Sequence, residues 1–197
     1  KFMVWYDNEW SYASQLIKLM DVICKYNNDP YYIDNQNFNR KNVLLRLDLN
    51  VPMQDGIITD NFRITSAMPT IKRILKDKPN RLMLMSHFGR PNGMEEKYSL
   101  KQIIPELEEV MGTSVELLPH GLSNKTIKDL SKQKSEIYLL ENLRFHVEET
   151  QYKSMDMTNN EVYDIIQQLS DVYVNDAFGS MHRDHSASND VFGLVMR

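Results

Sequence analysis

The sequence of 197 residues contains only one cysteine, Cys24, and no apolar run long enough to cross a bilayer. A single cysteine excludes an internal disulfide framework and fits a reducing compartment. We find no secretory signal, so we expect a cytoplasmic protein that has no membrane partner. An excess of positive charge is also missing, because the formal net charge is −4. We therefore expect no nucleic-acid partner, and an anion site would require a local concentration of arginines.

Familiar motifs for cofactors and metals are missing as well. Neither G-x-x-x-x-G-K-S/T nor G-x-G-x-x-G occurs, so we expect no nucleotide cradle of either kind in this chain. No histidine and cysteine have the spacing of a zinc site, and His182-Arg-Asp-His185 alone is a poor metal site, so we predict no metal. The sequence begins at Lys1 within an apolar run, which indicates a piece of a longer protein.

Three regions of different composition follow one another along the chain. Residues 1–27 contain a strand-like run and one helical pattern, which together cannot bury a core. Asparagine, aspartate, tyrosine and proline dominate residues 28–41, as expected of a linker. Residues 42–197 alternate between short apolar runs and amphipathic helical patterns. We predict an N-terminal strand–helix appendage, a linker and one folded domain.

The alternation in the third region predicts an α/β fold with a doubly wound, mostly parallel sheet. Right-handed crossovers would bring the carboxyl ends of all strands to one edge of that sheet. Ser99 with Gln102 and Thr158 with Glu161 form capping boxes at two helix starts. Prolines within two helical patterns should mark kinks or late helix starts, and these are Pro69 and Pro105. The predicted strands cover 43–49, 81–85, 115–118, 136–140 and 171–175, the predicted helices cover 61–78, 99–112 and 125–132, and a last helix follows the second capping box.

Polar and cationic residues follow three of the predicted strands in a repeated pattern. Each apolar run stops at a polar residue, and a histidine or an arginine comes shortly afterwards. Open α/β sheets bind their ligands just beyond the carboxyl ends of their strands. Taken singly, each of these residues could be an ordinary turn or surface residue. They are Ser86, His87 and Arg90 after 81–85, Arg144 after 136–140, and His182 with Arg183 after 171–175.

The first predicted strand ends with Arg46, Asp48 and Asn50, which alternate with leucines and therefore lie on one side. Central parallel strands are normally apolar on both faces, so these polar residues need a purpose. The alternative is a structural ion pair followed by a turn asparagine. Arg63 lies in the first turn of the next predicted helix, where the N-terminus favours anions, although a lone arginine there is more often a surface residue.

Taken together, the arginines of these segments are stronger evidence for an anion site than any one of them is alone. A cluster of them at one sheet edge would repel itself, and an acidic protein has little structural reason to build it unless a multiply charged anion binds there. We therefore predict a small ligand that carries phosphate, carboxylate or both. The arginines expected at that edge are Arg46, Arg63, Arg90, Arg144 and Arg183.

These segments, in this order, resemble the N-terminal domain of the phosphoglycerate kinase family over about residues 33–186. In that family, two doubly wound domains are joined by a hinge. The N-terminal domain binds 3-phosphoglycerate or 1,3-bisphosphoglycerate in a basic patch, and the C-terminal domain binds Mg-ADP or Mg-ATP. The resemblance rests on Leu44-Leu-Arg-Leu-Asp-Leu-Asn-Val-Pro52, Ser86-His-Phe-Gly-Arg-Pro91, Lys97-Tyr-Ser-Leu100, Leu140-Glu-Asn-Leu-Arg-Phe-His146 and Asp171-Val-Tyr-Val-Asn-Asp-Ala-Phe-Gly179.

The resemblance implies a phosphotransferase of glycolysis that moves a phosphoryl group reversibly between 1,3-bisphosphoglycerate and ADP. The nucleotide-binding C-terminal domain is absent from this chain, so the chain alone is expected to bind substrate without turnover. Arg63 matches the catalytic arginine of the family, which steadies the phosphoryl group during transfer. The implied substrate-binding residues are Asp48, Leu49, Asn50, Arg63, Ser86, His87, Phe88, Gly89, Arg90, Arg144, His182 and Arg183.

The head of the chain, Trp5-Tyr-Asp-Asn-Glu-Trp-Ser-Tyr12 with the helical pattern after it, resembles the C-terminal end of the glyceraldehyde-3-phosphate dehydrogenase family. That resemblance implies that Asn8 contacts the nicotinamide of NAD, provided that the dehydrogenase domain is complete in the parent protein. The two families catalyse consecutive glycolytic steps. We therefore expect that the chain spans the junction of a bifunctional fusion protein.

Two departures from the kinase pattern keep other functions open. Met181 and Asp184 stand where the kinase family usually has small residues, and the carboxylate of Asp184 would weaken anion binding. One alternative is a diverged, non-catalytic module that binds anions or serves as a scaffold. The other is a remnant of the dehydrogenase, in which the first 26 or so residues are the functional part.

Overall fold

A parallel sheet forms the centre of the computed structural model, which describes residues 33–132, 135–146, 149, 161–177 and 194–196. Its strands are β1 (Asn42–Leu47), β4 (Arg81–Met85), β5 (Glu116–Leu118), β6 (Ile137–Leu140), β7 (Val172–Asp176) and β8 (Leu194–Met196). They lie side by side in the order β5-β6-β4-β1-β7-β8, and every neighbouring pair is parallel.

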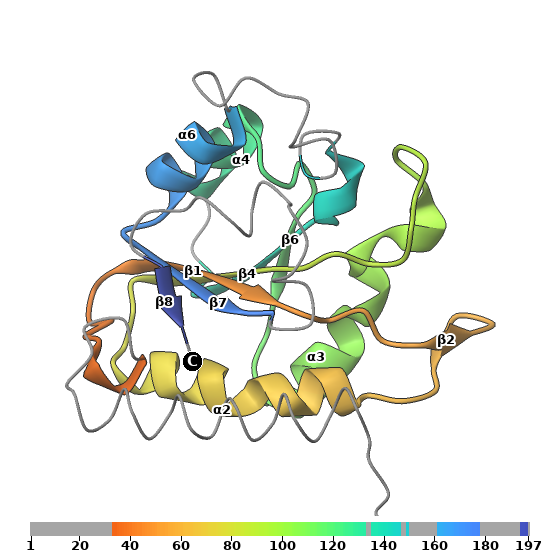
Figure 1. Ribbon diagram of the computed structural model, residues 1–197, viewed down its shortest axis with the longest axis horizontal. Coiled ribbons are helices and arrows are strands. Elements are labelled where there is room, and N and C mark those ends of the chain that lie inside the picture. Colours follow the sequence, from red (N-terminus) through yellow and green to blue (C-terminus); the bar gives the residue numbers. More distant parts are fainter. Residues whose placement is uncertain (1–32, 133–134, 147–148, 150–160, 178–193, 197) are drawn as a thin grey trace, which may run out of the picture.

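Helices cover both faces of this sheet (Figure 1). The α-helices are α2 (Phe62–Lys76), α3 (Ile104–Met111), α4 (Asn124–Leu130) and α6 (Glu161–Leu169), and the 3-10 helices are η1 (Ile33–Asn35), η2 (Glu96–Tyr98), η3 (Leu100–Ile103) and η4 (Leu143–Phe145). Helices α2 and α3 contact each other on one face, and α4 and α6 contact each other on the other. The predicted doubly wound α/β fold is confirmed. None of the helices in the described ranges is long and apolar enough to span a membrane.

Burial on both faces explains why the strands read as continuous apolar runs. Leu45 and Leu47 of β1 pack into the core beneath α2 and α3, whereas Leu44 packs into the core beneath α4 and α6. Ile33 and Phe38 join the first of these cores. The part of the predicted linker that the structure describes is therefore packed on the domain.

The chain diverges after two neighbouring strands. β4 lies between β1 and β6 in the sheet. The segment after β4 leads through η2 and η3 to α3 on one face, whereas the segment after β6 leads to α6 on the other (Figure 1). Open α/β sheets bind ligands beyond the carboxyl ends of the strands at such a place. We call this position, between β4 and β6, the switch point.

An unpredicted ribbon follows β1. Its antiparallel strands, β2 (Met53–Gln54) and β3 (Ile57–Ile58), are too short to produce a periodic pattern in the sequence. Asp55 and Gly56 join them with φ angles of 50° and 79°, as a two-residue hairpin turn of the mirror-image kind requires. The short strand β8 is also absent from the predicted elements.

The predicted helix 99–112 begins as a 3-10 helix and continues as α3. Pro105 lies in the first turn of α3, which confirms the late helix start predicted there, and the helix ends at Gly112 in the left-handed conformation, with φ of 69°. Pro69, by contrast, lies in the interior of α2. Thr158, which was predicted to cap the last helix, lies outside the described residues.

The capping box predicted at Ser99 is only half formed. The Ser99 hydroxyl accepts a hydrogen bond from the Lys101 backbone N–H at 3.2 Å and so caps η3. The Gln102 side chain does not return to the Ser99 N–H, because that group already donates to the Glu96 carbonyl oxygen. It donates instead to the carbonyl oxygens of Lys97 and Ser99, both at 2.9 Å. The prediction of a complete box is therefore wrong.

Candidate functional site

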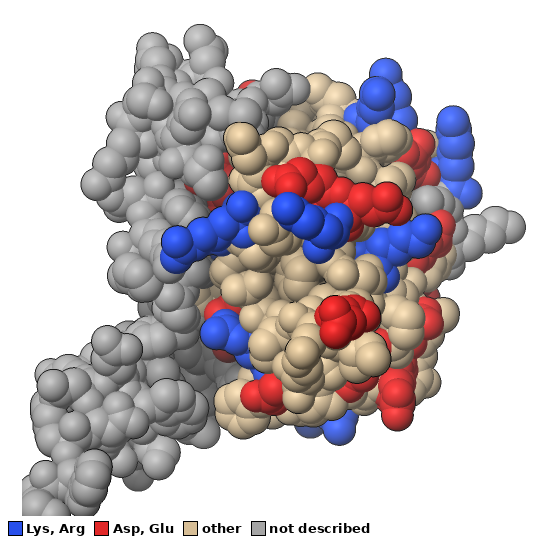
Figure 2. Space-filling model, turned by 90° about the vertical axis from the view of Figure 1, so that its right-hand side faces the viewer, with Lys and Arg blue, Asp and Glu red and all other residues tan. Residues whose placement is uncertain are grey.

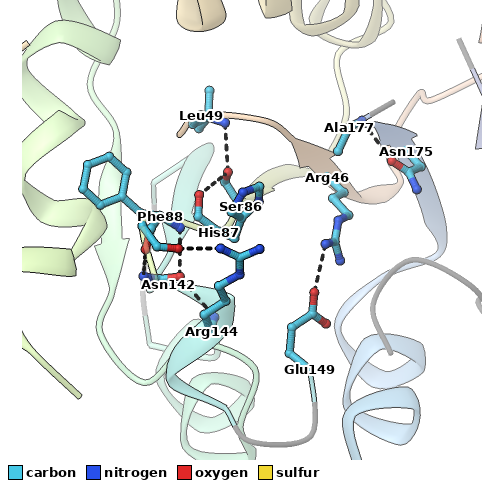
Figure 3. A network of polar contacts seen from close by, with 11 residues as sticks. Arg46, Leu49, Ser86, His87, Phe88, Asn142, Arg144, Glu149, Asn175 and Ala177 are labelled. Atoms are coloured by element: carbon cyan, nitrogen blue, oxygen red, sulfur yellow. Dashed lines mark hydrogen bonds and ion pairs between the residues drawn. The ribbon is translucent and has the colours of Figure 1, made fainter. Parts of the chain in front are cut away.

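Buried polar contacts join the loops that follow β1 and β4 at the carboxyl edge of the sheet (Figure 3). The Ser86 hydroxyl accepts a hydrogen bond from the Leu49 backbone N–H at 2.9 Å and donates to the His87 carbonyl oxygen at 3.0 Å. The side-chain oxygen of Asn50 accepts a hydrogen bond from the Gly89 N–H at 2.9 Å. The residues predicted at these two strand tips therefore lie together.

The loop that follows β6 joins them at the switch point. Arg144 lies in η4, and its guanidinium donates to the Gly89 carbonyl oxygen. The Asn142 side chain bonds the backbone of Phe88 on one side and the backbone N–H of Arg144 on the other. Arg144 thus lies beside the glycine-containing turn after β4, which is the neighbourhood predicted for it.

Helix α2 brings Arg63 to the tip of β1. Arg63 lies in the first turn of this helix, and its guanidinium forms an ion pair with the carboxylate of Asp48. The side chain of Arg63 is 46% exposed, so solvent and solutes reach it. The other oxygen of the Asp48 carboxylate accepts a hydrogen bond from the Asn50 N–H at 3.3 Å. Arg63 is therefore held at the same edge of the sheet as the predicted substrate-binding residues.

Arg46 does not belong to this exposed group, so its predicted place in an anion-binding cluster is wrong. Its side chain is 1% exposed and donates to the Glu149 carboxylate at 2.9 Å. Strands β4 and β7 flank β1 and α6 contacts it, so a side chain turned inward here is buried. The Nε and Nη1 atoms of Arg46 have no hydrogen-bond partner within the described part of the chain. The structural ion pair, which was the alternative, is the arrangement found.

His87 is neutral in this environment. The residue is 8% exposed. Burial, followed by the positive charge of Arg144, lowers the pKa of His87 to about 4, although the Asp48 carboxylate opposes this shift. A neutral imidazole offers hydrogen bonds but no charge to a bound anion. The attraction for an anion must therefore come from the arginines.

The remaining predicted residues lie at the surface or beyond what the structure describes. Arg90 is exposed in the loop after β4. Asn8, His182 and Arg183 lie outside the described residues, as does Asp184, and their roles stay predictions. Within the described ranges, no three His, Cys, Asp or Glu side chains are grouped so that they could hold a metal ion.

Charged side chains of both signs gather at this edge of the molecule. Figure 2 shows the side on which the β2–β3 ribbon lies in Figure 1, and Lys and Arg side chains cross it with Asp and Glu side chains among them. The ion pair of Arg63 with Asp48 also joins charges of opposite sign at the carboxyl edge of the sheet. Acidic partners limit the repulsion among the cations while no ligand is bound.

Sequence reasoning missed the side chains that hold these loops together. Glu141 is 8% exposed, and its carboxylate accepts hydrogen bonds from the Ser99 hydroxyl at 2.6 Å and from the backbone N–H groups of Leu100 and Asn142 at 2.8 Å. Asn142 is fully buried. The signal for both in the sequence is a carboxylate and an amide directly after an apolar strand, a position from which side chains bond to loop backbones.

The close packing of the turn after β4 requires glycine at position 89. Gly89 has a φ of 59°, and a Cβ there would lie 2.4 Å from the Tyr98 ring. Gly93 has a φ of 84° but nothing within 4 Å, so Gly93→Ala is a matched control that introduces backbone strain alone. We expect Gly89→Ala to lower the free energy of unfolding, measured by urea denaturation, by about 1 kcal/mol more than Gly93→Ala does. Equal losses in the two variants would contradict the packing argument.

Comparison with known proteins identifies the family. A profile of the family described as Phosphoglycerate kinase matches residues 33–196. The chain belongs to the phosphoglycerate kinase family. The phosphoglycerate kinases of Tetrahymena thermophila and Debaryomyces hansenii are each 43% identical to it, over 160 and 157 residues. Each alignment covers 75% of this chain and 38% of the relative, so the chain spans only about two fifths of the length of these kinases.

Solved structures of phosphoglycerate kinases have a similar fold. The kinase of Coxiella burnetii is 31% identical with a TM-score of 0.65, and the match covers 82% of this chain and 39% of that one. The kinase of Pyrococcus horikoshii OT3 is 27% identical with a TM-score of 0.69, and the match covers 84% of this chain and 42% of that one. The resemblance to phosphoglycerate kinases is confirmed. The resemblance of residues 1–27 to the dehydrogenase lies outside the described and matched residues and stays a prediction.

Proposed function

We propose that this chain is the substrate-binding part of a phosphoglycerate kinase, which moves a phosphoryl group reversibly between 1,3-bisphosphoglycerate and ADP. The observation that carries the proposal is the meeting of three loops and the N-terminus of α2 at one sheet edge. There Arg63 is held by Asp48, and Arg144 is held by the backbone of Gly89. In a chain of the kinase family, this arrangement supplies the planar donors that a phosphorylated carboxylate needs.

Neutral and acidic groups would orient the glycerate. Asp48 and Asn50, at the tip of β1, would contact its hydroxyl and carboxylate region. His87, which is neutral, would add a hydrogen bond without adding charge. Ser86 bonds to the Leu49 N–H and to the His87 carbonyl oxygen. It thereby holds the backbone that carries these side chains. Leu49, Phe88 and Gly89 would line the site.

The arginines would bind and stabilise the anionic groups. Arg90 and Arg144, together with His182 and Arg183, would bind the phosphate and carboxylate of the substrate. Arg63 would act on the phosphoryl group during its transfer. Phosphoryl transfer needs positioning and neutralisation of charge more than covalent help, so a partly exposed arginine at a helix N-terminus suits this role.

The nucleotide would come from outside this chain. Mg-ADP or Mg-ATP would bind to a C-terminal domain of the parent protein, and this chain alone would bind 3-phosphoglycerate without turnover because half of the active site is missing. The parent would act in the cytoplasm. If residues 1–27 end a complete dehydrogenase that holds NAD at Asn8, the parent would be a bifunctional enzyme of two consecutive glycolytic steps.

Calorimetric titration of the chain with 3-phosphoglycerate at low salt tests this function. We expect heat of binding from the unaltered chain, and a loss of about a hundredfold in affinity in the double variant Arg63→Ala with Arg90→Ala, because each would remove charge-assisted hydrogen bonds. Arg81→Ala is the matched control, since Arg81 begins β4 and so lies at the opposite edge of the sheet. It should bind as the unaltered chain does.

Two outcomes would count against the proposal. No heat with 3-phosphoglycerate, or equal binding by the double variant and the unaltered chain, would contradict a substrate site at this edge. The full-length parent, assayed for ATP formation from 1,3-bisphosphoglycerate and ADP, separates a kinase from a non-catalytic anion-binding module, which would form none.

A further inference from the structure

The backbone pairing between β4 and β6 stops short of the loops that carry the site. The last register pair of the ladder is Leu84 with Leu139. One more backbone hydrogen bond follows, from the Leu143 N–H to the Ser86 carbonyl oxygen at 3.1 Å. Beyond Ser86 the two segments part toward opposite faces of the sheet at the switch point. Side chains must therefore set the spacing between the turn after β4 and η4.

The side-chain amide of Asn142 supplies much of that link (Figure 3). Its oxygen accepts hydrogen bonds from the backbone N–H groups of Phe88 at 3.0 Å and Arg144 at 3.1 Å. Its nitrogen donates to the carbonyl oxygens of Phe88 at 2.7 Å and Tyr98 at 2.9 Å. These bonds use both donors and both acceptor positions of a primary amide.

The amide takes the place of a peptide group from a neighbouring strand. It bonds both the N–H and the carbonyl oxygen of Phe88, and so continues the link between the two segments past the end of the ladder. The same oxygen holds the Arg144 N–H, so the position of η4 follows that of Phe88. A carboxylate here would face two carbonyl oxygens, and an apolar side chain would leave buried backbone groups unpaired.

We propose that Asn142 is a positioning residue, which sets the distance between the turn after β4 and the guanidinium of Arg144 without touching substrate. Asn142 is fully buried, whereas the guanidinium that it places reaches the Gly89 carbonyl oxygen at the site. The effect of Asn142 on ligand affinity rests on the proposed function. Its effect on the two loops rests on the hydrogen bonds alone.

A double-mutant cycle with 3-phosphoglycerate as the probe tests the positioning role. We expect Asn142→Ala to weaken binding about tenfold to hundredfold, because a displacement of about 1 Å in a binding group has effects of this order. Arg144→Ala removes the group that Asn142 is inferred to place. The double variant should therefore lose less affinity than the two single losses multiplied together. Losses that simply multiply would overturn the proposal.

Asp77→Ala is the matched control for general destabilisation. The Asp77 carboxylate accepts a hydrogen bond from the Phe38 N–H at 3.0 Å. Asp77 is the C-cap residue of α2, at the end opposite Arg63, and its backbone N–H donates to the Ile74 carbonyl oxygen. We expect this variant to bind 3-phosphoglycerate as tightly as the unaltered chain does. Weakening equal to that of Asn142→Ala would overturn the proposal, because a loss of stability alone would then explain both.

Amide hydrogen exchange separates this inference from the proposed function. In Asn142→Ala, the N–H groups of Phe88 and Arg144 should exchange faster by a larger factor than the N–H of Leu84 within the ladder. Equal acceleration at these positions would overturn the positioning role, whatever the ligand does. Failure of the unaltered chain to bind 3-phosphoglycerate, with the expected exchange pattern present, would overturn the proposed function and uphold the positioning of the loops.

Discussion

Replacement of Glu149 by alanine is expected to lower the free energy of unfolding by about 3 to 5 kcal/mol. The Glu149 carboxylate is 2% exposed, and the guanidinium of Arg46 that donates to it is 1% exposed (Figure 3). Removal of the carboxylate would leave a buried cation without its counterion, and a buried uncompensated charge costs far more than a buried pair gains. Urea denaturation followed by circular dichroism measures the difference.

Two further variants distinguish the lost charge from lost packing. Arg46→Met combined with Glu149→Leu removes both charges at similar volume and should recover most of the lost stability. Glu95→Ala breaks a surface pair with Lys97, whose side chain is 66% exposed, and removes the acceptor of the Asn92 N–H, so it should cause only a small loss. A loss in Glu149→Ala as small as that in Glu95→Ala would show that Arg46 finds another partner.

The second large effect expected is a fall in stability of about 3 kcal/mol between pH 6.5 and pH 4, caused by His87. Burial, followed by the charge of Arg144, lowers the pKa of His87 from 6.5 to about 4. Between these values the unfolded chain binds a proton on this histidine and the folded chain does not. Each step to lower pH therefore favours unfolding, by up to about 1.4 kcal/mol per pH unit. This loss of stability is therefore absent well above pH 6.5 and complete well below pH 4.

Urea denaturation at successive pH values checks this window. His87→Gln cannot titrate, so it should remove most of the slope. His120→Gln, which replaces a histidine that is 44% exposed, is the matched control. Asp77 affects stability only below this pH range, because the hydrogen bond from the Phe38 N–H lowers the pKa of its carboxyl below the ordinary 3.8. Its stabilisation is lost only as the pH falls through that lowered pKa. A slope that survives in His87→Gln would contradict the assignment.

Local patterns in the sequence predict most of the fold because the apolar runs and the turn residues that bound them coincide with the strands. Strand β4 runs over the predicted 81–85. β1 ends at Leu47 rather than at residue 49, because the Leu49 N–H donates to the Ser86 hydroxyl instead of continuing the ladder. The hydrophobic pattern of the sequence does not show where a side chain replaces a backbone group as the hydrogen-bond partner.

The partners of buried polar groups lie beyond what local patterns can predict. Arg46 and Glu149 are 103 positions apart, and no spacing relates them. The burial of Arg46 follows only from the sheet order, which places β1 between β4 and β7. Arg63 and Arg144 were predicted at the correct edge because strand ends and helix starts determine their position. That Asp48 would pair with Arg63 required the three-dimensional arrangement.

Before any ligand arrives, the Asp48 carboxylate already occupies the guanidinium of Arg63. An incoming anion must compete with this internal carboxylate for the arginine. A chloride ion offers one charge and no pair of acceptor atoms, whereas a phosphate or carboxylate offers two acceptors in the geometry of the guanidinium. In the proposed kinase, Asp48 would therefore keep common salt ions from binding to Arg63, and would leave Arg63 available for the phosphorylated substrate.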